Sequence, residues 1–120
     1  MIMNPSEPII RMSKKGDAPA VWGGLPIASF RGVTAELDGE VIGVAGIMHT
    51  NPLQAFMTIQ EPMKKHRKAI VLGIREFRKL LALYSAPIFA FPNQMEPTAR
   101  GFLSYVGFTQ ESDEVYRWTQ

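Results

Sequence analysis

The chain has no cysteine among its 120 residues. This absence excludes disulfide bonds, thiol nucleophiles, Cys-x-x-Cys redox pairs, cysteine-ligated zinc and iron–sulfur clusters. A chain of this length buries roughly two-thirds of the surface that its unfolded form exposes, so it forms a core without covalent cross-links. The composition fits a reducing compartment, and we expect a cytoplasmic location.

Long hydrophobic runs are also missing. The longest strongly apolar stretch is Val41 to Met48, whereas a helix that spans a bilayer needs about 20 apolar residues. Residues 1–8 contain Pro, Asn, Ser and Glu but no apolar stretch of the kind found in secretory signals. We therefore expect neither a membrane span nor a secretory signal.

Several chemical motifs are absent as well. The sequence contains no Gly-x-Gly-x-x-Gly, no Walker loop and no Gly-x-Ser-x-Gly, which argues against the nucleotide sites and the serine nucleophile that these motifs build. His49 and His66 lie 17 residues apart, and neither has a carboxylate or imidazole partner at the i, i+4 spacing of a helical metal site. We expect no metal centre.

The length predicts one domain over residues 1–120. Residues 1–29 are rich in Pro, Gly and Ser, so we expect an irregular segment with one candidate edge strand at Ile9 to Met12. From Phe30 to Leu37 apolar and polar residues alternate, which is typical of a half-buried strand. Asp38-Gly39 predicts a type I′ hairpin turn, and Glu40 to His49, nearly all apolar, predicts a central return strand.

The second half of the chain predicts further strands and two helices. A third strand is expected at Gln54 to Gln60 and a long helix at Lys64 to Tyr84, where Gly73 suggests close approach to a neighbour. We then expect a strand at Ile88 to Phe91, a short helix at Thr98 to Val106 with Gly107 as C-cap, and a last strand at Val115 to Thr119. The strand, long helix and next strand favour a parallel pair. The fold class is therefore α/β (α+β), a mixed, mostly antiparallel sheet with one long and one short helix.

The basic residues are concentrated in one segment. The net charge is only +2, but seven of the 13 basic residues lie between positions 64 and 79: Lys64, Lys65, Arg67, Lys68, Arg75, Arg78 and Lys79. Such a cluster suits a phosphate-bearing ligand, a nucleic-acid backbone or an acidic protein, and it also suits a helix face that simply contacts water. All these interpretations stay open at this point.

The segment Ala99 to Phe108, Ala-Arg-Gly-Phe-Leu-Ser-Tyr-Val-Gly-Phe, resembles the C-terminal motif of the GNAT N-acetyltransferases. In that family an Ala opens a helix, an aromatic pair lies within it and Gly-Phe ends it. The order of the preceding hairpin, strand, long helix and strand is also that of the family, over about 80 residues from Phe30 to Trp118. The resemblance implies a GNAT-like fold and acetyl-CoA as a cofactor.

The resemblance also implies cofactor-binding residues. In the family, backbone N–H groups of a glycine-rich turn hold the pyrophosphate of coenzyme A. Alignment on Pro62 places Lys65, Lys68 and Ile70 at those positions, so both glycines are replaced and the two lysines meet the phosphates as point charges. The pantetheine would lie beside Thr58, Ile59 and Gln60. Asn93 either fixes a substrate amide or is a turn residue after Pro92.

The catalytic residues of the family match less closely. Leu103 occupies the position of the usual acid, a tyrosine, and a leucine cannot protonate a leaving thiolate. Tyr105 lies about 200° further round the helix, and it is either a weak substitute or a packing residue. Glu61, at the end of the third strand, is the candidate base, or it is a charge exposed to water.

A narrower resemblance follows from the short chain, the Arg75 to Lys79 stretch Arg-Glu-Phe-Arg-Lys and the altered pyrophosphate turn. Together they are similar to GNAT-like proteins of tailed phages, including small internal virion proteins, which retain the fold and lose acetyl transfer. The resemblance implies a structural or interaction protein with a protein partner, located in the host cytoplasm or the virion. The alternatives are an active acetyl-CoA-dependent N-acetyltransferase and a nucleic-acid-binding module that uses Lys64, Lys65, Arg67 and Lys68.

Overall fold

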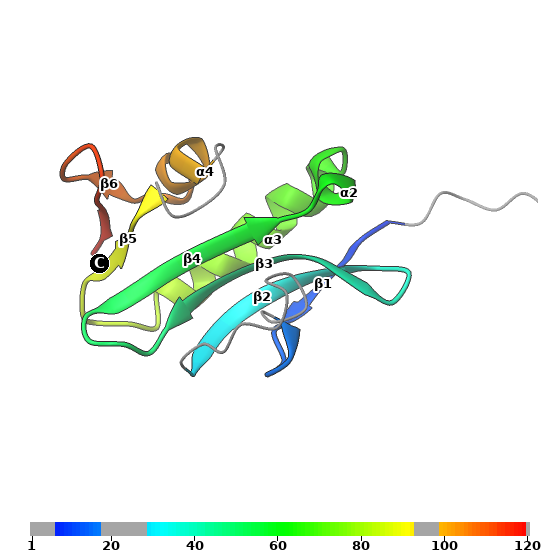
Figure 1. The fold of residues 1–120 in the computed structure, drawn as a ribbon, viewed down its shortest axis with the longest axis horizontal. Coiled ribbons are helices and arrows are strands. Elements are labelled where there is room, and N and C mark those ends of the chain that lie inside the picture. The colour runs from blue at the N-terminus through cyan, green and yellow to red at the C-terminus, as the bar shows by residue number, and fades with distance from the viewer. Residues whose placement is uncertain (1–6, 18–28, 93–98, 120) are drawn as a thin grey trace, which may run out of the picture.

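A seven-stranded sheet organises the described part of the protein (Figure 1). The structure is a computed structural model that describes residues 7–17, 29–92 and 99–119. The strands are β1 (Ile9–Met12), β2 (Phe30–Leu37), β3 (Glu40–Met48), β4 (Leu53–Ile59), β5 (Ile88–Ala90), β6 (Thr109–Gln110) and β7 (Tyr116–Trp118). They lie in the order β1-β2-β3-β4-β5-β7-β6. The described helices are α2 (Glu61–Lys64), α3 (Arg67–Leu81) and α4 (Ala99–Val106).

The β2–β3 hairpin forms as predicted. Its two turn residues both have positive φ, 51° at Asp38 and 85° at Gly39, which is the requirement of a type I′ turn. β3 pairs with β2 on one side and β4 on the other, both antiparallel. The apolar composition of β3 therefore does correspond to a central strand.

The parallel pair predicted from the strand, helix and strand order is β4 and β5. The chain leaves β4, passes through α2 and α3, and returns in β5 alongside β4. The parallel ladder has two residue pairs, Leu53 with Ile88 and Gln54 with Phe89. β4 continues to Ile59, well beyond that ladder. The mixed, mostly antiparallel sheet is confirmed.

The prediction of one continuous helix from Lys64 to Tyr84 is wrong. The segment forms two helices, α2 and α3, which His66 separates with a non-helical backbone at φ −99° and ψ 73°. The first helix, α2, starts earlier than predicted, at Glu61. Pro62 lies in its first turn, where the N–H that proline lacks would have no partner within the helix, so proline is well tolerated. Glu61 is therefore the first residue of a helix rather than the end of a strand, and the described part of the chain has two short helices beside the long one.

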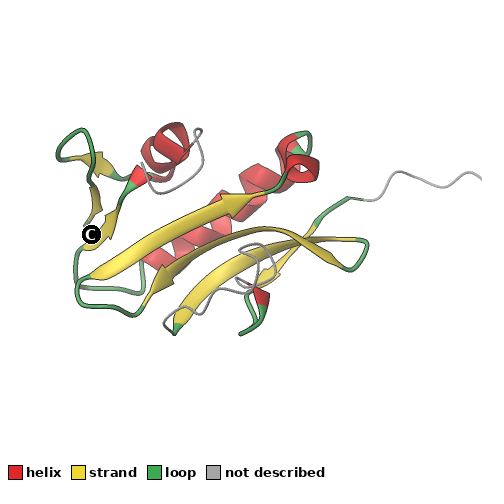
Figure 2. Ribbon diagram, viewed as in Figure 1, coloured by secondary structure: helices red, strands yellow, loops and turns green. Residues whose placement is uncertain are grey.

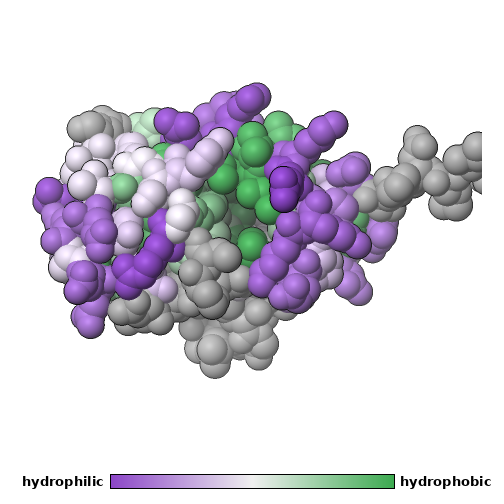
Figure 3. All heavy atoms as spheres, turned by 90° about the horizontal axis from the view of Figure 1, so that it is seen from above, coloured by the Kyte–Doolittle hydropathy of each residue, from purple (hydrophilic) through white to green (hydrophobic). Residues whose placement is uncertain are grey.

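The core lies between one face of the sheet and the helices α3 and α4 (Figure 2). The predicted apolar face of α3 points inward, and Ile74, Phe77 and Leu81 are buried. Gly107 ends α4 with φ 122°, and the Phe108 N–H donates to the Leu103 carbonyl at 2.9 Å. Phe108 is buried as a result, which confirms the predicted cap. Apolar side chains also gather in a hollow of the face seen in Figure 3.

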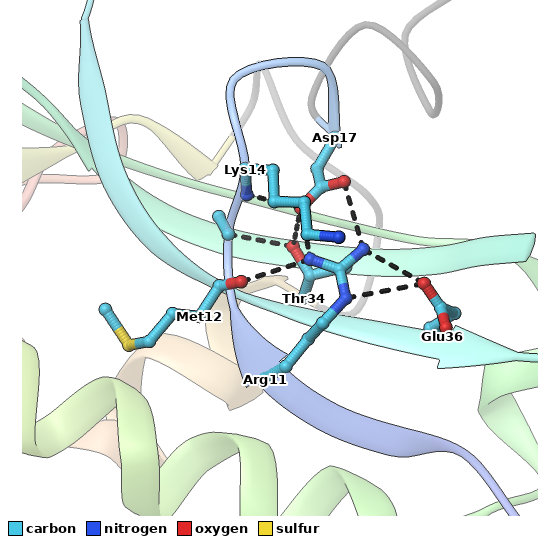
Figure 4. A network of polar contacts seen from close by, with 7 residues as sticks. Arg11, Met12, Lys14, Asp17, Thr34 and Glu36 are labelled. Carbon is cyan, nitrogen blue, oxygen red and sulfur yellow. Dashed lines mark hydrogen bonds and ion pairs between the residues drawn. The ribbon is translucent and has the colours of Figure 1, made fainter. Parts of the chain in front are cut away.

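A polar cluster attaches β1 and the turn after it to the opposite face of the sheet (Figure 4). The buried carboxylate of Asp17 accepts bonds from the Arg11 guanidinium at 2.7 and 3.1 Å, the Lys14 N–H at 2.6 Å and the Thr34 hydroxyl at 2.8 Å. Arg11 also donates to Glu36 at 3.1 Å. Burial raises the pKa of Asp17, but the bonds from Arg11, Lys14 and Thr34 outweigh it and hold that pKa below its ordinary value.

We expect Asp17→Asn to lower the free energy of unfolding by about 1–3 kcal/mol at neutral pH, because Arg11 loses its least exposed anionic partner. A depressed carboxyl pKa stabilises the fold above the unfolded value of about 3.9, and this stabilisation is lost as the pH falls through the lower folded value. Chemical denaturation from neutral pH into this acid range measures both effects. As the pH falls, the free energy of unfolding of Asp17→Asn should decrease less than that of the wild type, because the variant has no carboxylate at position 17 to protonate.

Glu36→Gln is the matched control, because Glu36 is the more exposed of the two acids that bind Arg11. It should cost only about 0–1 kcal/mol. Equal losses in the two variants would contradict a special role of the buried carboxylate.

Candidate ligand pocket

An apolar pocket lies between the sheet and the three helices, with a volume of about 450 Å³. Its floor comes from β2, β3 and β4, and its walls come from α2, α3 and α4. The described lining residues that the following paragraphs use are Ile10, Gly43, Ala45, Met57, Ile59, Met63, Lys64, Gly73, Gly101 and Phe102. In Figure 3 the opening is an apolar hollow with a polar rim.

Small residues leave this space open. Gly43 and Ala45 lie on β3, a strand whose inward side chain at Ile47 is fully buried. A Cβ atom placed on Gly101 of α4 would meet no atom of the described residues within 4 Å. A Cβ on Gly73 of α3 would meet, among the described atoms, the Cδ1 of Ile10 at 3.8 Å. The prediction that Gly73 marks a close approach is therefore wrong, since its missing side chain adds to the pocket instead.

The pocket has little polar chemistry. Among the described lining residues, Lys64 alone carries a charge. Thr34 also lines the pocket, but its side chain points to the opposite face of the sheet, where its hydroxyl bonds with Ser13 and Asp17, each at 2.8 Å. The Lys64 Nζ forms an ion pair with Glu61 Oε1 at 2.9 Å, one helical turn earlier. Such a site suits an apolar group better than a polar one.

The residues expected beside a pantetheine arm are only partly brought to the pocket. Ile59 lines it together with Met57. Thr58 lies between them in β4, so its side chain points to the other face of the sheet. Gln60 follows the strand and is exposed, and its N–H donates to the Ile42 carbonyl at 2.8 Å. Asn93 lies outside the described residues.

The two lysines expected at the phosphates are exposed and are not among the lining residues. Lys65 ends α2, and Lys68 lies in the first turn of α3. Lys68 contributes, with Arg67, Val71 and Leu72, to a shallow depression on the outer side of α3. This first turn has no acidic residue and no side-chain cap, so its cations face the positive end of the helix dipole. An anion bound there would relieve that repulsion.

The two candidate catalytic residues do not line the pocket. The Glu61 side chain is 85% exposed and bonded to Lys64. Tyr105 is 63% exposed, whereas the α4 residues that line the pocket are Gly101 and Phe102. Leu103 is buried in the core. The structure therefore assembles no acid and base pair from these residues.

The described residues contain no cluster of metal ligands and no helix that could span a membrane. In ranges 7–17, 29–92 and 99–119, no three His, Asp or Glu side chains gather where they would hold a metal ion. None of the helices in these ranges is long and apolar enough to cross a membrane.

Comparisons of the chain with models of protein families, with curated proteins and with solved structures find no match. Its function is therefore inferred from the pocket and from the side chains around it.

Sequence reasoning missed the pocket itself. Gly43, Ala45, Gly73 and Gly101 were not expected to form a site. The one local signal is the pair of small residues at the inward positions 43 and 45 of β3, where the next inward residue, Ile47, is large. That signal becomes specific only when the glycines of α3 and α4 are known to face the same space.

Gly73→Ala should raise the free energy of unfolding by about 0.5–1 kcal/mol, because alanine is the better helix former and its methyl group has room. Gly46→Ala is the opposite case. A Cβ on Gly46 would lie 2.8 Å from two ring carbons of Phe56, so this variant should be destabilised. Thermal and denaturant unfolding measure both, and a destabilised Gly73→Ala would show that the space beside Gly73 is not open.

Proposed function

We propose that the protein is a non-catalytic, GNAT-like binding protein that holds the acyl chain of a ligand in the apolar pocket. The observation that carries the proposal is the pocket of about 450 Å³, which residues without large side chains keep open. Ligand sites commonly have volumes of about 300–1,000 Å³ and apolar linings. Each methylene group that enters such a site contributes about 0.8 kcal/mol, so a chain of several carbons gains useful affinity.

The order of elements supports the GNAT-like part of the proposal. An antiparallel hairpin leads to β4, which joins β5 in a short parallel ladder through a long helix. β4 runs past that ladder and lines the pocket with Met57 and Ile59. If the ligand is an acyl-coenzyme A, Lys65 and Lys68 are the residues that we propose for its phosphates.

The positions of Glu61 and Tyr105 favour binding over catalysis. A general base must reach the proton that it removes, and Glu61 is exposed and held by Lys64 instead. Tyr105 points away from the core on α4. An active acetyl-CoA-dependent N-acetyltransferase is therefore the weaker proposal. A structural or interaction role with a protein partner, as in the phage proteins that the sequence resembles, is compatible with a retained binding pocket.

Nucleic-acid binding is also a weaker proposal. The outer side of α3 presents exposed Arg67, Lys68, Arg75, Arg78 and Lys79, which suits a phosphate backbone. Single-stranded nucleic acid also needs exposed aromatic rings on which bases stack, but Phe77 is buried in the core.

Filling the pocket should abolish ligand binding. We expect decanoyl-coenzyme A to raise the melting temperature of the wild type in a saturable way, with about 2.7 kcal/mol of added stability at 100 times its Kd. Gly73→Leu and Gly101→Leu place a side chain in the pocket and should remove that shift. Ser104→Leu is the matched control, because Ser104 is exposed on α4 and does not line the pocket. Acetyl-coenzyme A and coenzyme A are tested in parallel, so that the contribution of the acyl chain to binding is measured apart from that of the coenzyme A group.

A shift that survives both glycine variants would contradict binding in this pocket. A shift with coenzyme A equal to that with decanoyl-coenzyme A would contradict recognition of the chain.

Acetyl transfer to amine acceptors should not exceed the uncatalysed rate, since the described residues that line the pocket include no acid and base pair. A discontinuous assay with acetyl-coenzyme A and a panel of amines measures it. Transfer that falls by two or more orders of magnitude in Glu61→Gln would restore the enzyme proposal.

A further inference from the structure

We propose that the ligand of the apolar pocket is a single-chain carboxylate, a fatty-acid type of amphiphile, whose head is bound by the ammonium group of Lys64. This inference rests on the proposed function and names the class of ligand that the same pocket takes.

The charge distribution of the lining points to one anion. Lys64 is the charged residue among the described lining residues, and the other described side chains that face the pocket are apolar. The Thr34 hydroxyl bonds with Ser13 and Asp17 on the opposite face of the sheet. A chain that carried hydroxyl or amide groups along its length would leave them without partners, which is costly in a buried site. A plain alkyl chain with one charged end matches the site.

The position of Lys64 matches the end of such a chain. Its side chain is 41% exposed although the residue lines the pocket, so its ammonium group lies where the pocket meets water. Lysine commonly places its carbon stem along apolar surface while its charged end stays hydrated. A carboxylate at this depth keeps part of its hydration and gains a cation, while its alkyl chain enters the apolar space.

Lys64 already binds a carboxylate, and this partner is easily exchanged. Glu61 lies three residues earlier, and its side chain is 85% exposed. An exposed pair of this kind contributes little to stability, about 0–1 kcal/mol. Release of Glu61 returns its carboxylate to water, and the ligand carboxylate takes its place on the ammonium group. The burial of the chain then supplies the net gain.

The chain contains a matched pair for the experiment. Lys79 binds Glu76 at 3.0 Å with the same i, i+3 spacing, in α3, and it does not line the pocket. Lys79→Met therefore removes an equivalent ion pair without touching the site. Lys64→Met keeps the length and apolar character of the lysine stem and removes only the charge.

The test compares decanoate with decan-1-ol, which has the same chain and no charge. Isothermal titration of both into the full-length wild type, Lys64→Met and Lys79→Met gives the affinities, with circular dichroism to check that each variant is folded. We expect Lys64→Met to weaken decanoate about tenfold, which corresponds to about 1.4 kcal/mol, and to leave decan-1-ol within about twofold. Lys79→Met should change neither. The Lys64 effect should shrink as salt is added.

A second variant keeps the inference testable if Lys64→Met does not fold. Glu61→Gln removes the competing carboxylate and should strengthen decanoate, whereas Glu76→Gln, its counterpart in α3, should not. Decanoate binding that is equal in Glu61→Gln, Glu76→Gln and the wild type would overturn the role of Lys64.

The remaining outcomes separate this inference from the proposed function. If neither decanoate nor decan-1-ol binds the wild type, the pocket does not take acyl chains and both fail. If decan-1-ol binds the wild type but decanoate binds more weakly, or if Lys64→Met leaves the affinity for decanoate unchanged, the carboxylate inference is overturned. The proposal that the pocket takes an alkyl chain is then still supported. Equal loss of both ligands in Lys64→Met would show that the substitution disturbs the pocket as a whole, and it would overturn the assignment of the carboxylate to the Lys64 charge.

Discussion

The packing of α3 against the sheet is the interaction on which the other features depend. Phe77 and Leu81 are almost completely buried between the helix and the sheet, and each such side chain contributes roughly 1.5–3 kcal/mol on burial. Because α3 joins β4 to β5, this contact also places β5, which carries the fully buried Ile88. Leu103 and Val106 of α4 pack in the same core. The helix α3 therefore holds strands β1 to β4 together with strands β5 to β7.

The same helix packs fully toward its end and incompletely around its middle. Phe77 and Leu81 fill the space near the end of α3, whereas Gly73, midway along the helix, leaves space. The sheet below has Gly43 and Ala45 at the corresponding place, and α4 presents Gly101. Protein interiors are normally close-packed, and the hollow lined by small residues on three elements is therefore the feature on which the proposed ligand binding rests. The α2–α3 junction places Lys64 beside this space, and the other described lining residues carry no charge.

The site was predicted only in part. Ile59 was expected beside a ligand and lines the pocket, because strand alternation and the position of β4 before the helix are local features. Lys65, Lys68, Glu61 and Tyr105 were selected by their alignment with a family motif, and the structure places all four outside the lining. Lys64 was seen as one of seven clustered cations. Only its position relative to Met63, Gly73 and the sheet distinguishes it from the others, and this position depends on residues far apart in the chain.

The sequence by itself determined the features whose causes are local. The hairpin follows from the positive φ that Asp38 and Gly39 accept, the end of α4 from Gly107 and Phe108, and the strands and helix faces from periodicity. Tertiary structure alone decided the break at His66, the bonding of Asp17 to Arg11 and Thr34, and the pocket. The break at His66 was missed because the apolar periodicity of a helix continues across a short interruption. The Asp17 cluster and the pocket were missed because a buried carboxylate and an empty volume each lie between segments that only the fold brings together. These features depend on non-local contacts, for which a single sequence carries no local signal.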